Sequence, residues 1–382
     1  MKVIFLFAFV LLSPLTAHGA RRVGDSVTIS NTKFMIWGGA PTGSMPKGAS
    51  VAHDGKHLYV SNFGKIGRDN ISVFKADPLT FERYIHYKGN SIESYVSRDN
   101  KTLYSTNMYG DYFDVIDLAT YKLKKRVRIY GGFPKLILLN KTGDKAFVSL
   151  WAASSFAVID LKSYNYNIFR TRQRNPRGLA LNHDESLLYL ANNGSKNFTV
   201  VETSSLVKGK KKHVGAKPTL KHYAIGRGPR HVVASKDGKT MYFSVMGGSR
   251  IFVVDTATQK TTKIIHVGQK PKTIFLSFDG KFLYTANYTG HSLSIIDTST
   301  YKVKELPLPV VRTSGLVVRP DDKFIYITGW CTDDIWAVQR INAGETAQTP
   351  MGNNYNKFRR KGCRKCKLKF LDCEPIRSKR KK

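Results

Sequence analysis

The sequence has few acidic residues. Its 382 residues include 27 Asp and Glu against 62 Lys and Arg. Eleven of those acids occupy two turn positions that recur along the chain, where carboxylates typically bond to nearby backbone. No spare acidic pair has a spacing suited to general acid–base catalysis, and the histidines are scattered without metal-ligand spacing. A nucleophile motif, a Walker loop and a dinucleotide fingerprint are also absent. We therefore expect a protein that is not an enzyme.

Long apolar runs are also scarce. The one near the start, Val3–Leu12, follows Lys2 and precedes the small residues around Gly19 and Ala20. This order predicts a signal peptide over residues 1–20. An uncleaved membrane anchor is the alternative, but the run is short for a membrane span. No later run reaches that length, so we expect a secreted, periplasmic or cell-surface protein with no transmembrane span in the mature chain.

The excess of basic residues gives a formal net charge of +35. Such a charge indicates partners rather than fold. Outside the cytoplasm, a chain this basic meets nucleic acid, anionic glycans, phosphate-rich envelope polymers and acidic lipid.

Residues 268–306 form a unit that recurs along the chain. The unit contains four short β-type runs, separated by the turn Asp279-Gly280-Lys281 and by Asn, Ser and Thr turn residues. This pattern predicts a four-stranded antiparallel meander. The turn recurs with a period near 42 residues, at Asp54, Asp99, Thr142, Asp184, Asp237, Asp279 and Asp321. Four strands repeated at this period are typical of propeller blades.

The predicted fold is an all-β, seven-bladed β-propeller of four-stranded antiparallel blades over residues 21–343. The seventh repeat ends after its third strand, at 337–341. Residues 33–37 precede the first repeat as a fourth strand precedes each later one, so this N-terminal strand is expected to close blade 7 and remove the open edges. A basic, cysteine-containing tail, 344–382, follows, and we expect the protein to be a monomer.

Four of the repeats resemble the YVTN repeat. The segments that carry the likeness are Leu58–Asn62, Leu103–Asn107, Leu188–Asn192 and Leu283–Asn287, together with flanking Gly-x-x-Pro and Asp-Gly-Lys elements. The resemblance covers roughly residues 43–341 and implies the propeller architecture. The family includes bacterial periplasmic propellers, surface-layer proteins and relatives with lactonase activity, and some members bind DNA. The resemblance therefore does not select an activity.

Cations recur where the first strand of each blade begins. A proline opens that strand in five of the seven repeats, and a cation follows it at Lys47, Lys135, Arg177, Arg230 and Lys272, with His231 one position further. These side chains are expected to converge at the mouth of the central channel and to bind a polyanion such as DNA or an anionic glycan. The alternative is a set of hydrated surface side chains lying along the protein.

Two further segments are strongly basic. Blade 4 gains about eleven residues that contain Lys210, Lys211 and Lys212, and residues 351–382 contain 13 Lys or Arg against two acids. Both are predicted to contact the polyanion. Aromatic residues expected near the mouth could stack on bases or sugars; they are Tyr109, Tyr112, Phe113, Trp151, Phe156, Tyr288 and Trp330.

The four cysteines lie near the C-terminal end, at Cys331, Cys363, Cys366 and Cys373. In an exported protein they suggest two disulfides, with three pairings open. A zinc site made by the four thiolates is the alternative. No other cofactor is expected.

The leading hypothesis is an exported, non-enzymatic propeller that binds a polyanionic partner through a basic face and the tail. A surface or envelope platform for protein–protein interaction is the second hypothesis. A lactonase-like or metal-assisted hydrolase is the third.

Overall fold

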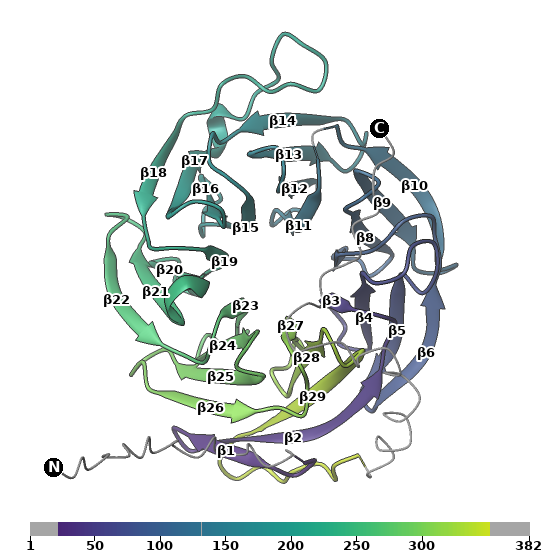
Figure 1. Cartoon of the computed structure of the whole chain (residues 1–382), viewed down its shortest axis with the longest axis vertical. Coiled ribbons are helices and arrows are strands. Elements are labelled where there is room, and N and C mark those ends of the chain that lie inside the picture. Colours follow the sequence, from purple (N-terminus) through teal and green to yellow (C-terminus); the bar gives the residue numbers. More distant parts are fainter. Residues whose placement is uncertain (1–21, 131, 352–382) are drawn as a thin grey trace, which may run out of the picture.

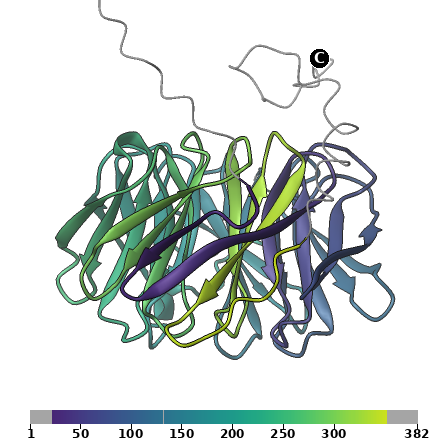
Figure 2. The ribbon, with the colours of Figure 1, turned by 90° about the horizontal axis from the view of Figure 1, so that it is seen from below.

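Seven sheets are arranged in a closed ring in the computed structural model (Figure 1). The structure describes residues 22–130 and 132–351. Six sheets have four antiparallel strands and one has five, which confirms the predicted seven-bladed propeller. The predicted signal peptide and residues 352–382 of the predicted tail lie outside the described residues. Seen from the side, the blades form a disc (Figure 2).

Each blade runs from an inner strand beside the ring axis to an outer strand at the rim. The inner strands are β3 (Pro46–Val51), β7 (Glu93–Val96), β11 (Pro134–Leu139), β15 (Pro176–Leu181), β19 (Pro229–Ala234), β23 (Pro271–Leu276) and β27 (Thr313–Val318). The second strands are β4 (His57–Asn62), β8 (Thr102–Asn107), β12 (Lys145–Leu150), β16 (Leu187–Asn192), β20 (Thr240–Val245), β24 (Phe282–Asn287) and β28 (Phe324–Gly329).

The third strands are β5 (Ile71–Ala76), β9 (Tyr112–Asp117), β13 (Ser155–Asp160), β17 (Asn197–Glu202), β21 (Arg250–Asp255), β25 (Ser292–Asp297) and β29 (Asp334–Ile341). The outer strands are β6 (Leu79–Ile85), β10 (Lys122–Arg128), β14 (Tyr166–Arg170), β18 (Leu220–Ala224), β22 (Thr261–His266), β26 (Val303–Pro307) and, in blade 7, β2 (Thr32–Pro41). The 3-10 turns η1 (Thr203–Ser205) and η2 (Met246–Gly248) follow β17 and β20.

The ring closes as the sequence predicts. Strand β2 pairs antiparallel with β29, from Lys33 opposite Ile341 to Pro41 opposite Asp334. The four-residue strand β1 (Ser26–Ile29) then pairs with β2 as a fifth strand, which the repeat pattern did not predict. Blade 7 therefore combines strands from both ends of the ring. Strand β1 covers the outer edge of β2, which would otherwise be exposed.

The hydrophobic core lies between neighbouring blades. At the closure, Phe34 of β2 is fully buried and its ring meets Phe282 of blade 6 edge-on, with centroids 5.2 Å apart. Phe113 and Phe156 are likewise fully buried on third strands. The prediction that these two rings lie near the mouth and could stack on a ligand was wrong, because both side chains are buried against the adjoining sheet.

The recurring acids hold turns, as expected. Asp54 accepts a hydrogen bond from the backbone nitrogen of Lys56 at 3.0 Å, and Asp117 accepts one from that of Thr120 at 2.8 Å. The asparagines that end the second strands are buried: Asn287 Nδ2 donates to Ser294 Oγ at 2.8 Å. These residues join strands within a blade and are therefore part of the fold rather than of a site.

Candidate anion-binding site

The first strand of most blades has a bulge just after its opening residue. In six blades the pairing register shifts directly after that residue, for example between Pro134 and Ile137 in β11. A bulge bends a strand and redirects the side chains beside it. The five predicted cations each follow such a proline. The repeat thus fixes both their place in the chain and the irregular backbone that carries them.

A hydroxyl from the preceding blade bonds to the cation's carbonyl oxygen in four blades. Ser149 Oγ donates to Arg177 O at 2.9 Å and Ser244 Oγ donates to Lys272 O at 3.1 Å. Thr106 and Thr328 make the same bond to Lys135 O and Lys47 O. The four donors precede the residue that ends the second strand, and they had not been singled out from the sequence.

The structure brings the five predicted cations together, and we call them the cation cluster: Lys47, Lys135, Arg177, Arg230 and Lys272. Four of them, all but Arg230, are only 4–8% exposed. The Nζ atoms of Lys47 and Lys272 lie 4.8 and 5.2 Å from the ring centre of Trp330. A shared ring contact of this kind stabilises both ammonium groups. The sequence predicted that the five cations converge, but it did not predict that aromatic rings enclose them.

Aromatic residues from several blades surround the ammonium groups. Lys135 Nζ lies 4.8 Å from the ring centre of Trp151, and Lys272 Nζ lies 4.2 Å from that of Tyr288. Of the aromatic residues predicted to stack on a ligand, these two and Trp330 therefore contact cations of the protein itself. Tyr109 is 46% exposed.

Charge repulsion and burial act together on the cluster. Burial lowers the pKa of Lys47, Lys135 and Lys272 well below the usual range, and the charges of Arg177 and Arg230 lower it further. Burial, followed by the charge of Arg177, lowers the pKa of Arg230 to about 9. A buried charge is costly unless an opposite charge or a hydrogen bond compensates for it. The cluster is thus an environment that favours an added negative charge.

One carboxylate, that of Glu93, pairs with the cluster. Arg177 Nη2 donates to Glu93 Oε1 at 2.5 Å. The Nε and Nη1 atoms of Arg177 have no hydrogen-bond partner among the described residues, and neither has His231 Nδ1. Burial, followed by the charges of Arg177 and Arg230, lowers the pKa of His231 to about 3, so this imidazole is neutral.

The three lysines of the blade 4 insertion lie away from the channel. The hairpin 207–214 is the teal loop that projects beyond β14 at the top of Figure 1. It is attached to blade 3 by Gly215 N, which donates to Ile168 O at 2.9 Å, and by His213, whose ring stacks on Tyr166 at 4.2 Å. Lys210, Lys211 and Lys212 are exposed.

Those lysines belong to a larger basic surface on the rim of blades 2–4, which we call the basic arc. It consists of exposed residues on β10, on β14 and the turn after it, on the segment 207–217 and on β18. They are Lys122, Lys124, Lys125, Arg128, Arg170, Arg172, Arg174, Lys208, Lys210, Lys211, Lys212, Lys217 and Lys221. The sequence contains a signal for this surface that was missed: 118–143, 161–183 and 203–236 hold 21 Lys or Arg and no acid.

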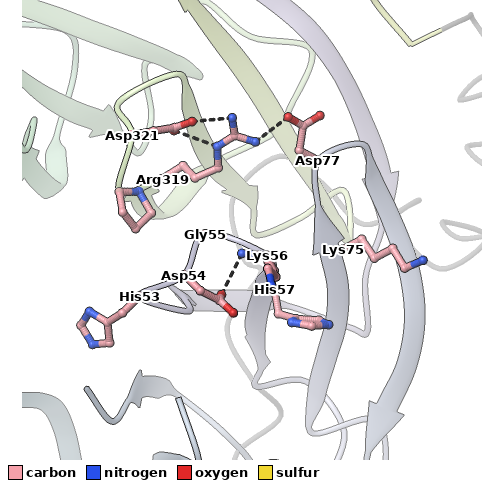
Figure 3. Close-up of a pocket in the computed structure, with 10 residues that line it drawn as sticks. His53, Asp54, Gly55, Lys56, His57, Lys75, Asp77, Arg319 and Asp321 are labelled. Carbon is pink, nitrogen blue, oxygen red and sulfur yellow. Dashed lines mark hydrogen bonds and ion pairs between the residues drawn. The ribbon is translucent and has the colours of Figure 1, made fainter. Parts of the chain in front are cut away.

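A different cavity, of about 550 Å³, lies at the seam between blades 1 and 7 (Figure 3). Its central residue is Arg319, which donates to Asp77 at 2.6 Å and to both oxygens of Asp321 at 2.8 and 2.6 Å. The bond to Asp77 joins blade 7 to blade 1, and the two bonds to Asp321 hold the guanidinium within its own turn. The cavity is therefore part of the ring closure.

The remaining predicted site residues are the cysteines. Cys331 lies in the turn that joins β28 to β29. Cys363, Cys366 and Cys373 lie outside the described residues, so neither the disulfides nor the alternative zinc site can be placed. Within residues 22–130 and 132–351, no three His, Cys, Asp or Glu side chains lie close enough to hold a metal ion.

Comparison with known proteins supports the fold. No family model matches the chain, so membership of the YVTN-repeat family stays a prediction. A hydrazine synthase structure from Kuenenia stuttgartiensis has a TM-score of 0.66 at 18% identity, covering 79% of this chain and 96% of that one. A virginiamycin B lyase structure from Staphylococcus aureus has a TM-score of 0.65 at 14% identity, covering 81% and 99%.

One curated relative matches part of the chain. Antigen Lp49 from Leptospira interrogans serogroup Icterohaemorrhagiae serovar copenhageni (strain Fiocruz L1-130) is 28% identical over 231 residues, which are 59% of this chain and 48% of the relative. The chain thus spans about half the length of the curated relative that it matches. In the part of the chain that the structure describes, we find no helix with the length and apolar character of a membrane span.

Proposed function

We propose that this protein is an exported, non-enzymatic propeller that binds a polyanion, such as DNA or an anionic glycan, along the basic arc. The observation that carries the proposal is the exposure of 13 cations on the rim of three successive blades. Exposed Lys and Arg bind phosphates or sulfates by releasing the counterions that surround them. This mode of binding needs a long cationic surface and no particular base or sugar.

The cation cluster has a narrower role in this proposal. Lys47, Lys135, Arg177 and Lys272 are each less than a tenth exposed. A polymer that lies across the ring face cannot reach side chains buried to this extent. Their arrangement favours a single small anionic group, and the polymer binds at the rim instead.

Export and the surface platform remain proposals as well. The relative from Leptospira is named an antigen, a name that agrees with exposure outside the cell. A protein partner with an acidic surface would use the same cations of the basic arc. A protein complex that survives high salt would favour that second function, since polyanion binding by counterion release weakens steeply with salt.

The experiment is a charge reversal on the hairpin. The variant K210E/K211E/K212E and the wild-type chain are compared for binding to a 30-nucleotide duplex and to heparin by fluorescence anisotropy at two salt concentrations. The matched control reverses three exposed lysines of blades 5 and 6, K260E/K263E/K304E, and changes the net charge by the same amount.

We expect the hairpin variant to lose at least about tenfold in affinity, and its salt slope to decrease by about three. The control variant should lose much less. Equal losses in the two variants would mean that only net charge matters, and would overturn the assignment to the basic arc.

A further inference from the structure

The central channel continues below the cation cluster as a cavity of about 370 Å³. All seven inner strands contribute to its lining, which places it on the ring axis. Its size falls in the range of small-molecule sites. Glu93 and His231 line the end beside the cluster, and Arg98, Lys141 and Glu185 line the opposite end.

The walls between these ends are apolar. Half-buried side chains from four blades face this space: Leu136 and Leu138, Leu181, Val233 and Phe275. An apolar surface in contact with water costs free energy in proportion to its area. The channel therefore offers burial to an apolar group several carbons long, and its end at Glu93 and His231 adjoins the cation cluster through the ion pair of Glu93 with Arg177.

Donors for an anion lie next to the cavity, because Arg177 is bonded to Glu93, which lines it. Arg177 is 4% exposed and has two nitrogens without a partner among the described residues. Its third nitrogen is bound to Glu93, so that carboxylate fixes the guanidinium and has its own charge compensated. A buried donor that is left unbonded costs about 1–3 kcal/mol, and a bound carboxylate would remove that cost.

Close packing fixes the position of Glu93. A Cβ atom on Gly48 would lie 2.0 Å from Glu93 Oε2, so this strand position has room only for glycine. Similarly, a Cβ atom on Gly178, the residue after Arg177, would lie 2.7 Å from the Cα atom of His231. The ion pair and the imidazole are thus held in place by the backbone, as a preorganised binding site requires.

We propose that the central channel binds an organic acid with an unbranched apolar body, its carboxylate beside Arg177 and His231 and its carbon chain along Leu138, Val233 and Phe275. This site is distinct from the basic arc and takes a different class of ligand. Charge complementarity selects the acid over a neutral or cationic amphiphile. The apolar wall selects a long acid over acetate or a bare phosphate.

The test uses the full chain and four probes in isothermal titration calorimetry: decanoate, decyltrimethylammonium, acetate and inorganic phosphate. Decanoate is expected to bind at least tenfold more tightly than acetate or phosphate, because its methylene groups leave water. Decyltrimethylammonium should not bind. The proposal is overturned if decanoate does not bind, if the cationic amphiphile binds equally well, or if the two small anions match decanoate.

Variants locate the site. The double variant R177M/E93Q removes both charges of the ion pair and so avoids an orphaned carboxylate. Leu138→Trp fills the apolar part of the channel without changing its charge. Each should weaken decanoate binding about tenfold or more, whereas Lys263→Met on the outer strand of blade 5 should leave it unchanged. Unchanged affinity in folded L138W would exclude the channel, even if the double variant failed to fold.

Discussion

The cation cluster and the basic arc are both made of Lys and Arg side chains, but these side chains are buried in the cluster and exposed in the arc. In the cluster, the residues stand at the start of inner strands, are enclosed by aromatic rings and depress one another's pKa. In the arc, they stand on outer strands and on a projecting hairpin, in contact with water. Burial, rather than residue type, therefore decides what a cation can bind. A buried cation recognises one small group at close range, whereas an exposed one attracts a polymer over a distance set by salt.

Salt should separate the two regions most strongly. If a DNA duplex contacts six or more cations of the basic arc, raising salt from about 50 to 200 mM should lower its affinity by about a thousandfold or more. Buried charges are screened much less, so decanoate affinity should change by less than about threefold. Anisotropy and calorimetry in the same buffers measure the two. Equal salt dependence would remove the distinction between the regions.

Replacing a cation by methionine should reduce the stability of the protein more in the cation cluster than in the basic arc. Arg177→Met removes the ion-pair partner of Glu93, whose side chain is 15% exposed, and should lower the free energy of unfolding by about 3 kcal/mol. Lys211→Met removes an exposed charge and should change it by less than about 0.5 kcal/mol. Urea denaturation followed by tryptophan fluorescence compares them. A small loss in the arginine variant would contradict the burial of the pair.

The hydroxyls behind the cluster should matter less than the cations. Ser149→Ala removes a bond to Arg177 O and the acceptor of the Leu136 backbone nitrogen, which donates to Ser149 Oγ at 3.1 Å. The loss should be about 1–3 kcal/mol. The exposed Ser204→Ala, beside the arc, is the control and should stay within about 0.5 kcal/mol. Equal unfolding midpoints for the two variants would show that these hydroxyls do not support the cluster.

A change of pH should have the smallest effect among these tests, and it should act on the affinity of the channel for decanoate. A bound carboxylate favours the charged form of the lysines whose pKa is lowered, so protons are taken up on binding and affinity is higher near neutral pH than at alkaline pH. It should fall severalfold as pH rises from about 7 to 9. The charged or titratable groups in or against the cluster are Lys47, Lys135, Lys272, Arg177, Arg230, Glu93, His231 and Tyr288. Calorimetry in buffers of different ionisation enthalpy detects the proton uptake; an affinity that rises with pH would contradict it.

The repeat pattern was sufficient to predict the fold. The seven recurring turns gave the number of blades, and the unmatched strand before the first repeat gave the closure of the ring by β2. Strand β1 was missed because four residues outside the repeat have no register to compare with. Its pairing depends on the edge that β2 exposes only after the ring has closed.

The site was predicted less completely. The repeat register placed five cations around one axis. How far each of these side chains is exposed, however, depends on loops from other blades. Phe63 and Trp330, for example, lie 267 positions apart in the chain, and both rings contact Lys47. The ion pair of Arg177 with Glu93 could not be predicted from the sequence either, since Glu93 is 84 positions away. Three acid-free stretches were visible in the sequence and would have pointed to the basic arc.

The two sets of cations should form two separate sites. The direct test is to titrate decanoate into the protein alone and into the protein saturated with heparin, by calorimetry in one buffer. We expect the same stoichiometry and a decanoate affinity that agrees within about twofold in the two titrations, because decanoate occupies the channel and heparin the rim. Displacement of heparin by decanoate, or loss of decanoate binding in the presence of heparin, would contradict it.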